Sequence, residues 1–581
     1  MKSKIYLLII MAGLFASCSK DSLVRNPQDR LDDDTYWSSE KNVRTYAYDF
    51  YPDFFVGYAS GFTFGPYLYQ GQSLNDDFGP TNPPQFTKII PNSGAGWSFA
   101  TVRRANIMID RVDRVPGLSE EAFKHWKGVG RFFRAMAYAN LVNSFGDVPW
   151  FSKPPESDET DLMFKARDPR AVVMDSVLAD FKYAAENIRA VDGEKGLNVT
   201  KWVAMAYMSR IFLFEGTWEK YHEANTAKSQ EYLEAARWAA NEVMTNGGYT
   251  IATTYRECFN SLDLSKNNEM IMYRRYAAGL LTHSLNSYVN REGQTGPNKD
   301  LMESYLCTNG LPITQSPLLY EGDKNIDQVM ANRDPRMFNT YNKEIRPNGS
   351  YNRTNLLGVS TTGYATHKFL NDEIKDQSIG LSNQNPTHAP VIRYGEVLLN
   401  YAEAVAELGA LTQADLDKSI NVLRKRPTGI PGNDEQLPDL QLLGGKPAAN
   451  GVAIVDPKRD PEVSEMLWEI RRERRLELVM EGFRLDDLRR WKKLDYTDTE
   501  QNPEINRGAW IKRSEWLKDD GTSWLKDVTL TGADEGYIIP SPTAKRIFTE
   551  EKVYLDPLPL DQIKLYEDNG KELAQNPGWT Q

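Results

Sequence analysis

The spacing of apolar residues predicts helices over much of the chain. Apolar positions recur at three- and four-residue steps, which places them on one face of an α-helix. The segments with this spacing are 99–112, 119–144, 169–189, 201–215, 231–245, 388–408 and 413–426. In 201–215, small Ala206 lies beside large Tyr207 on the packed face, which lets neighbouring helices approach closely. The pattern predicts a mainly α protein, a solenoid of paired amphipathic helices.

Long tracts without helical periodicity separate these helices. They cover residues 57–96, 276–385, 428–462 and 496–536 and are rich in Gly, Asn, Thr, Pro and Tyr. Loops of this length in a compact protein are usually functional, so we expect the ligand surface among them. No Pro/Gly/Ser-rich linker divides the chain, which predicts a single domain over residues 18–581.

The first residues have the pattern of an export signal. Lys2 and Lys4 precede an apolar stretch of 12 residues, 5–16, that is followed by Ser17 and Cys18. A membrane-spanning helix needs about 20 apolar residues. The pattern therefore predicts that residues 1–17 are a cleaved signal and not an anchor.

The order Leu14, Phe15, Ala16, Ser17, Cys18 resembles the lipobox of bacterial lipoproteins, with Phe15 where leucine is commonest. We therefore expect a lipid on Cys18, the alternative being an ordinary signal peptide that ends near a cysteine. The residues after this cysteine, Ser19, Lys20 and Asp21, resemble the export tag of surface lipoproteins. The expected location is the outer membrane, lipid-anchored and exposed at the cell surface.

Charge and motif content exclude several classes of function. Signal removal would change the formal charge from -11 to -13, which disfavours nucleic acid as a partner. The two cysteines of the mature chain, Cys258 and Cys307, are too few for a disulfide framework. The five histidines lack the spacing of HExxH, and GxSxG, GxxxxGK[ST] and strand-linked GxGxxG motifs are absent. We expect no metal and no cofactor.

The strongest local signal is residues 470–494, IRRERRLELVMEGFRLDDLRRWKKL, in which both signs of charge alternate at helical spacing. A nucleic-acid helix would need one basic face instead. The segment closely resembles the hallmark of the SusD/RagB family, which reads ERRxEL, EGxR and DLRRW. The matching residues are Glu473, Arg474, Glu477, Leu478, Glu481, Gly482, Arg484, Asp487, Leu488, Arg489, Arg490 and Trp491.

Other sequence blocks of the family appear in the expected order before and after this segment, so the resemblance covers nearly the whole mature chain. It implies about four tetratricopeptide-like helix pairs with large loop-rich elaborations. The pairs would lie within about 119–245 and 388–426, the glycan-facing insertions at 57–96 and 276–385, and the signature helices at 466–494. The signature itself is expected to form a partly buried charge network without ligand contact.

The resemblance also implies a function. Such proteins are non-catalytic surface lipoproteins that capture oligosaccharide or polysaccharide for a SusC-like TonB-dependent outer-membrane transporter. The rival functions are a surface glycoside hydrolase, with a carboxylate pair such as Asp76 and Asp77, and a structural transporter lid without its own ligand affinity.

Aromatic rings stack on sugar C–H faces and polar side chains bind the hydroxyls. The stacking candidates are Tyr67, Tyr69, Trp97, Tyr288, Tyr305 and Tyr320, and the polar candidates are Asn75, Asp76 and Asp77. Packing in the core is the alternative for Trp97 and for each tyrosine.

Overall fold

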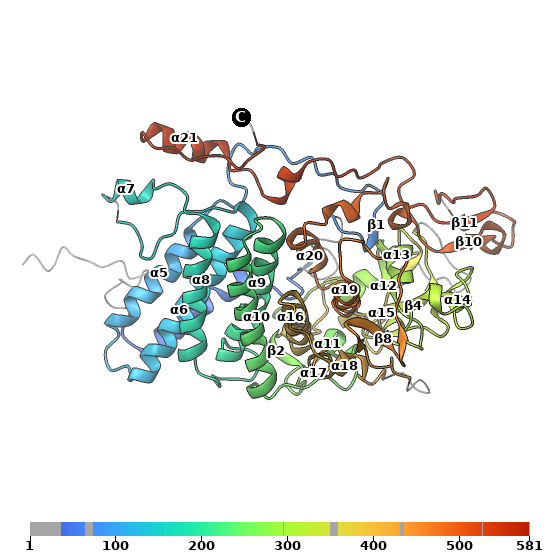
Figure 1. Ribbon diagram of the computed structural model, residues 1–581, viewed down its shortest axis with the longest axis horizontal. Coiled ribbons are helices and arrows are strands. Elements are labelled where there is room, and N and C mark those ends of the chain that lie inside the picture. Colours follow the sequence, from blue (N-terminus) through green and yellow to red (C-terminus); the bar gives the residue numbers. More distant parts are fainter. Residues whose placement is uncertain are drawn as a thin grey trace, which may run out of the picture.

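The computed structural model describes residues 36–63, 65, 74–156, 158–293, 295–348, 358–429, 435–525 and 527–579. One half is a layer of long helices that lie side by side (Figure 1). These are α5 (Ala100–Arg111), α6 (Glu120–Phe145), α8 (Arg170–Asn187), α9 (Lys201–Tyr221), α10 (Thr226–Asn246) and α16 (Tyr394–Glu407). Each packs against the next in this order. The predicted mainly α solenoid is confirmed.

Local sequence fixes where these helices begin. The Ser119 hydroxyl accepts a hydrogen bond from the backbone N–H of Ala122 at the start of α6, and Thr200 does the same for Val203 at the start of α9. These side chains satisfy backbone donors that the first turn of a helix leaves unpaired. Helices α6 and α9 therefore begin within one residue of the predicted positions.

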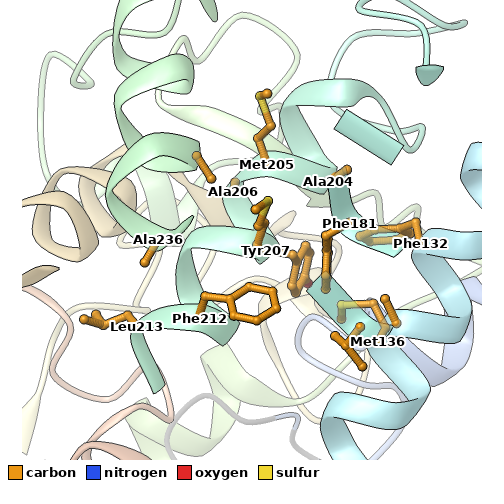
Figure 2. Close-up of a cluster of buried hydrophobic side chains, with 14 of the residues drawn as sticks. Phe132, Met136, Phe181, Ala204, Met205, Ala206, Tyr207, Phe212, Leu213 and Ala236 are labelled. Carbon is orange, nitrogen blue, oxygen red and sulfur yellow. The ribbon is translucent and has the colours of Figure 1, made fainter. Parts of the chain in front are cut away.

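Large and small side chains alternate in the core between these helices (Figure 2). The ring of Phe132 on α6 meets Phe181 on α8 edge-on, with ring centroids 5.9 Å apart. Between α9 and α10, Ala206 and Ala236 are fully buried, and a Cβ on Gly216 would lie 2.7 Å from Cγ of Leu233. Small residues thus permit the close approach of α9 to α10 that the sequence predicts.

The other half is rich in loops and short elements (Figure 1). Its helices are α11 (Glu257–Asn260), α12 (Leu285–Arg291), α13 (Lys299–Ser304), α14 (Ile326–Met330) and α15 (Arg336–Thr340). The antiparallel pairs are β1 (Phe78–Gly79) with β3 (Gly296–Pro297), β2 (Met270–Arg274) with β6 (Ala389–Arg393), β4 (Tyr341–Ile345) with β5 (Tyr364–Thr366), and β10 (Trp510–Lys512) with β11 (Glu535–Tyr537). The strands β7 (Gln441–Leu443), β8 (Lys446–Ala449) and β9 (Val452–Ala453) form a meander. The smaller helices elsewhere are α3 (Glu40–Tyr48), α4 (Tyr51–Phe54), α7 (Thr160–Met163) and α21 (Leu560–Asp568).

Two predicted helices differ from the structure. Residues 389–393 of the predicted helix 388–408 form strand β6, because they pair with β2, and α16 starts only at Tyr394. The predicted helix 413–426 is two short helices, α17 (Gln413–Asp417) and α18 (Ile420–Arg424), since Ser419 leaves helical geometry at ψ -91°. Tertiary pairing overrides the local pattern at β6.

The signature segment connects the two halves. It forms α19 (Glu465–Glu477), which packs against α16, and α20 (Arg484–Arg490), which packs against α9. Gly482, with φ +87°, lies in the turn between them in a conformation that favours glycine. In the described part of the chain, no helix has both the length and the apolar content to cross a bilayer.

Candidate functional site

The signature residues form a buried ionic network. Oε1 of Glu477 on α19 lies 2.8 Å from Nη1 of Arg393 and 2.8 Å from Nη1 of Arg426. Both arginines also pair with Glu269, the residue before β2. Glu269 and Glu477 are fully buried, more than the expected partial burial. The network joins the start of β2, the end of β6, the segment after α18 and the end of α19.

The arginines keep these carboxylates charged. Burial alone would raise the pKa of Glu477, but the charges of Arg426, Arg393 and Arg336 lower it to about 2. A buried carboxylate with this many donors stabilises packing only while all partners remain. A structural role without ligand contact stays the prediction for this carboxylate.

A second cluster fixes α20. Oε1 and Oε2 of Glu403 on α16 each lie 2.6 Å from a guanidinium nitrogen of Arg490, and the Trp491 indole N–H donates to Oε1 at 2.7 Å. Arg474 on α19 pairs with Asp487 on α20 at 2.9 Å. The signature therefore ties α16, α19 and α20 into one unit.

The predicted polar sugar ligands form buried ion pairs and hydrogen bonds inside the protein, which corrects that prediction. Asp76 pairs with Arg484 at 2.7 Å, and Asp77 pairs with Arg475 at 2.6 Å. Asp76 and Asp77 are 3% and 2% exposed, and Asn75 accepts a hydrogen bond from the backbone of Asp77 at 3.0 Å. Because the carboxylates of Asp76 and Asp77 are paired with arginines, they anchor the 75–77 segment to α19 and α20.

Three of the predicted stacking rings are also buried, contrary to the expectation that they are exposed. Trp97 packs edge-on against Phe145, with ring centroids 5.0 Å apart. Packing in the core was the alternative to sugar stacking for this residue. Tyr288 is 5% exposed in the core of the loop-rich half. Tyr305 is fully buried, and its hydroxyl donates to that of Tyr341 at 3.3 Å. None of them presents a ring face to solvent.

Tyr320 differs from these three because it is half-buried. The guanidinium of Arg333 lies 5.6 Å from its ring centroid. Tyr67, Tyr69 and the lipidation residue Cys18 lie outside the described residues, and their roles stay predictions. Tyr320 thus remains a candidate with an accessible ring.

The structure places two aromatic rings near Tyr320 that the sequence reasoning missed. Trp510 on β10 and Tyr537 on β11 are directly opposite each other across the strand pair, and both are half-buried. Nζ of Lys324 lies 5.0 Å from the Trp510 ring centroid and 5.3 Å from that of Tyr537. We call this set, with Tyr320 and Asp323, the aromatic face.

Hydrogen bonds order the aromatic face. The Tyr537 hydroxyl donates to Oδ2 of Asp323 at 2.6 Å, which links β11 to the loop that carries Tyr320 and Lys324. Desolvation and this bond to a carboxylate raise the pKa of Tyr537 above its ordinary value, so the hydroxyl stays protonated. Lys512 and Glu535, the outermost strand partners, are exposed beside the rings. Flat rings bordered by polar groups suit the amphipathic faces of sugars.

The aromatic face lies at the end of the molecule opposite α5 and α6 (Figure 1). Of its two new residues, Trp510 lies inside the loop tract 496–536 and Tyr537 directly follows it. Trp510-Ile511-Lys512 and Glu535-Gly536-Tyr537 alternate between outward and buried positions. That period of two is the signal that could have revealed a short hairpin, but it spans only three residues in each strand. Within the described residues, no three His, Cys, Asp or Glu side chains converge as metal ligands.

Comparison with known proteins places this architecture in a family. A sequence profile described as the SusD family matches residues 259–579, which include the signature helices and both strands of the aromatic face. The chain belongs to the SusD family. A second profile, described as starch-binding associating with outer membrane, matches residues 96–213 in the helical layer.

Individual SusD-like proteins are similar along most of the chain. A SusD-like protein of Bacteroides ovatus is 25% identical over 424 residues, which are 70% of this chain and 72% of the relative. The crystal structure of a SusD-like carbohydrate-binding protein from Bacteroides fragilis superposes with a TM-score of 0.63 at 22% identity and covers 92% of this chain and 99% of its own. A laminarin-binding SusD-like protein has a TM-score of 0.55 at 16% identity, with 93% and 99% covered. The TM-scores of these two structures show that they share the fold of this chain.

Proposed function

We propose that this protein is a glycan-binding lipoprotein that captures oligosaccharide or polysaccharide at the cell surface and delivers it to a SusC-like TonB-dependent outer-membrane transporter. The observation that carries the proposal is membership of the SusD family. A laminarin-binding protein and a complex with xylogluco-oligosaccharide among the structural neighbours support glycan as the ligand class.

We assign glycan contact to the aromatic face. A sugar ring would stack on Trp510 and Tyr537 after the side chain of Lys324 moves away from them. This side chain is exposed, and its contacts with the two rings are the only interactions described for it. The freed ammonium group and the Asp323 carboxylate would then bind hydroxyls. Tyr320 extends the surface along the neighbouring loop, and Tyr67 and Tyr69 stay candidates for the same ligand.

The proposed location follows from the N-terminus. Signal cleavage before Cys18 and its lipidation would tether the protein to the outer membrane, exposed at the surface beside the transporter. The description of the second matching profile, association with the outer membrane, supports this location.

Binding without catalysis is the simplest function for these residues. The carboxylate pair considered for a hydrolase, Asp76 and Asp77, is held by Arg484 and Arg475 away from solvent. A general acid and base need access to the glycosidic bond and to water. No described feature favours the hydrolase.

Calorimetry of the full mature chain against a panel of neutral and acidic polysaccharides tests the proposal, with an assay for released reducing sugar. We expect binding without sugar release, and weaker binding in Trp510→Ala. Binding of no glycan would favour the transporter lid without ligand affinity. Release that disappears in a carboxylate variant would favour the hydrolase.

A further inference from the structure

We propose that the protein has a second sugar site, a cleft between α11, β4 and residues 428–429 that binds one neutral sugar unit. The inference rests on the proposed glycan-binding function and names a further subsite. The cleft has a volume of about 600 Å³, within the range of about 300 to 1,000 Å³ that is usual for small-molecule sites. It shares no residue with the aromatic face.

Three asparagines give the cleft a set of oriented acceptors. In each, the side-chain amide nitrogen donates to a backbone carbonyl oxygen. The bonds are Asn260 to Leu370 at 3.1 Å, Asn339 to Thr428 at 3.2 Å, and Asn342 to Thr366 at 3.3 Å. These bonds fix the amides, and no described side chain or backbone group donates to their Oδ1 atoms. Asn339 is only 5% exposed, so its Oδ1 needs a partner from within the cleft.

The cleft also has a donor at its rim. Nζ of Lys343 is exposed and lies 5.0 Å from the ring centroid of half-buried Phe338. A sugar C–H face placed on Phe338 would displace this ammonium group to the rim, where it can donate to a hydroxyl. Hydroxyls both donate and accept, so one sugar unit satisfies both kinds of group.

The cleft is lined by two arginine or lysine residues and two glutamates, so its lining carries no net charge and favours a neutral ligand. Asp372 accepts from Arg256 at 2.9 Å and interacts with His367 at 3.0 Å. Glu257 accepts from Thr254 and from Asn267, each at 3.3 Å. Lys343 and Glu344 both line the cleft, so this rim carries one charge of each sign. A uronic or sulfated sugar would bring its anion close to the carboxylates of Glu257 and Glu344, which repel it.

The cleft and the aromatic face can be separated by mutation. Asn342 is half-buried on β4, and among the described residues its side chain makes just one hydrogen bond, the long one to Thr366. Asn342→Trp therefore fills the cleft at little cost to the fold. Lys343→Ala removes one donor from an exposed position and keeps the test valid if the tryptophan variant misfolds. Asn246→Trp, on the exposed side of α10, is the matched control.

The experiment is saturation-transfer NMR of the full mature chain with laminaribiose, cellobiose, maltose, xylobiose and the charged control digalacturonic acid. We expect at least one neutral disaccharide to give signals that Trp510→Ala and Asn246→Trp preserve. Asn342→Trp should weaken that binding at least about tenfold, and Lys343→Ala about two- to tenfold.

Three results would overturn the inference. They are neutral disaccharide signals that survive in both cleft variants, preferential binding of digalacturonic acid, and the absence of signal from every neutral disaccharide. If long glycans still bind and lose affinity in Trp510→Ala alone, the cleft proposal fails while the glycan-binding function stands. If no long glycan binds either, the proposed function itself fails.

Discussion

Arg393 and Glu477 are 84 residues apart in the chain, and their charged groups meet 2.8 Å apart in the interior where the helical layer joins the loop-rich half. Arg393 ends strand β6, immediately before α16, and Glu477 ends α19. The same guanidinium pairs with Glu269 and Glu481. One arginine thus pairs with three buried carboxylates, whose remaining charge is met by Arg426, Arg336 and Lys368.

Arg393→Met should be strongly destabilising. It leaves Glu269, Glu477 and Glu481 with fewer cations in a buried site, and removing one partner of a buried ion pair costs about 3 to 5 kcal/mol. Urea unfolding at neutral pH measures the loss. Arg393→Lys should recover only part of it, because one ammonium group cannot bond three carboxylates in a planar fork.

The control is Arg237→Met on α10. Arg237 pairs with Glu234 at 2.6 Å, but both side chains are about half exposed, and such pairs contribute about 0 to 1 kcal/mol. Equal losses in the two variants would show that the buried network is not what stabilises the junction.

Trp510→Ala should weaken glycan binding without unfolding the protein. Loss of a stacking ring costs about 1 to 3 kcal/mol, which weakens binding by about 5- to 150-fold. Calorimetry against the cognate polysaccharide measures this, with circular dichroism to confirm the fold. Tyr305→Phe is the matched control, because Tyr305 is fully buried and should leave affinity unchanged. The reverse pattern would move the binding site to the originally predicted residues.

The sequence predicts what is local and fails where distant segments meet. In helices α6, α8, α9 and α10, apolar residues recur every three to four positions. The buried face of each helix can therefore be predicted without knowing which element packs against it. The signature network is partly readable as well, since Glu473 and Glu477 are one helical turn apart. Asp76 is different, because its partner Arg484 lies 408 residues later. A carboxylate in a Gly- and Tyr-rich tract resembles a sugar ligand until that arginine is located.

The same reasoning explains the aromatic candidates. Tyr288 and Tyr305 lie in a loop-rich tract whose burial depends on a second core that periodicity does not reveal. Trp510 and Tyr537 are brought together by a strand pair of three residues each, which is too short to register as a pattern. Exposure of a loop aromatic is therefore a tertiary property.

Glu219→Gln should raise stability more at pH 8 than at pH 5. Desolvation, and then repulsion from Glu215 one turn away, raise the pKa of Glu219 from 4.5 to about 7. The folded protein therefore binds more protons than the unfolded chain between these values, so Glu219 lowers stability progressively as pH rises through that window. Glutamine removes this penalty.

Thermal unfolding at pH 5, 6, 7 and 8 measures the difference between variant and parent. The exposed Glu234→Gln on α10 serves as the control, because Glu234 has a half-exposed side chain. A difference that is constant across these pH values, or that shrinks as pH rises, would contradict the raised pKa.

Cys18→Ala should release the protein from outer-membrane fractions. The lipid attached at this residue is the proposed membrane contact, and the described helices include none that could span a bilayer. Several acyl chains hold a protein firmly because each buried methylene contributes about 0.8 kcal/mol. Immunoblots of membrane and soluble fractions after a salt wash compare the variant with the parent. Cys258→Ala, which removes a buried free thiol, controls for general loss of a cysteine.

Detergent pull-down of the parent should recover a TonB-dependent barrel, and Cys18→Ala should recover less. If the unlipidated variant stays with the membrane and retains the barrel at parental levels, the tether is dispensable and contact with the transporter alone holds the protein at the surface.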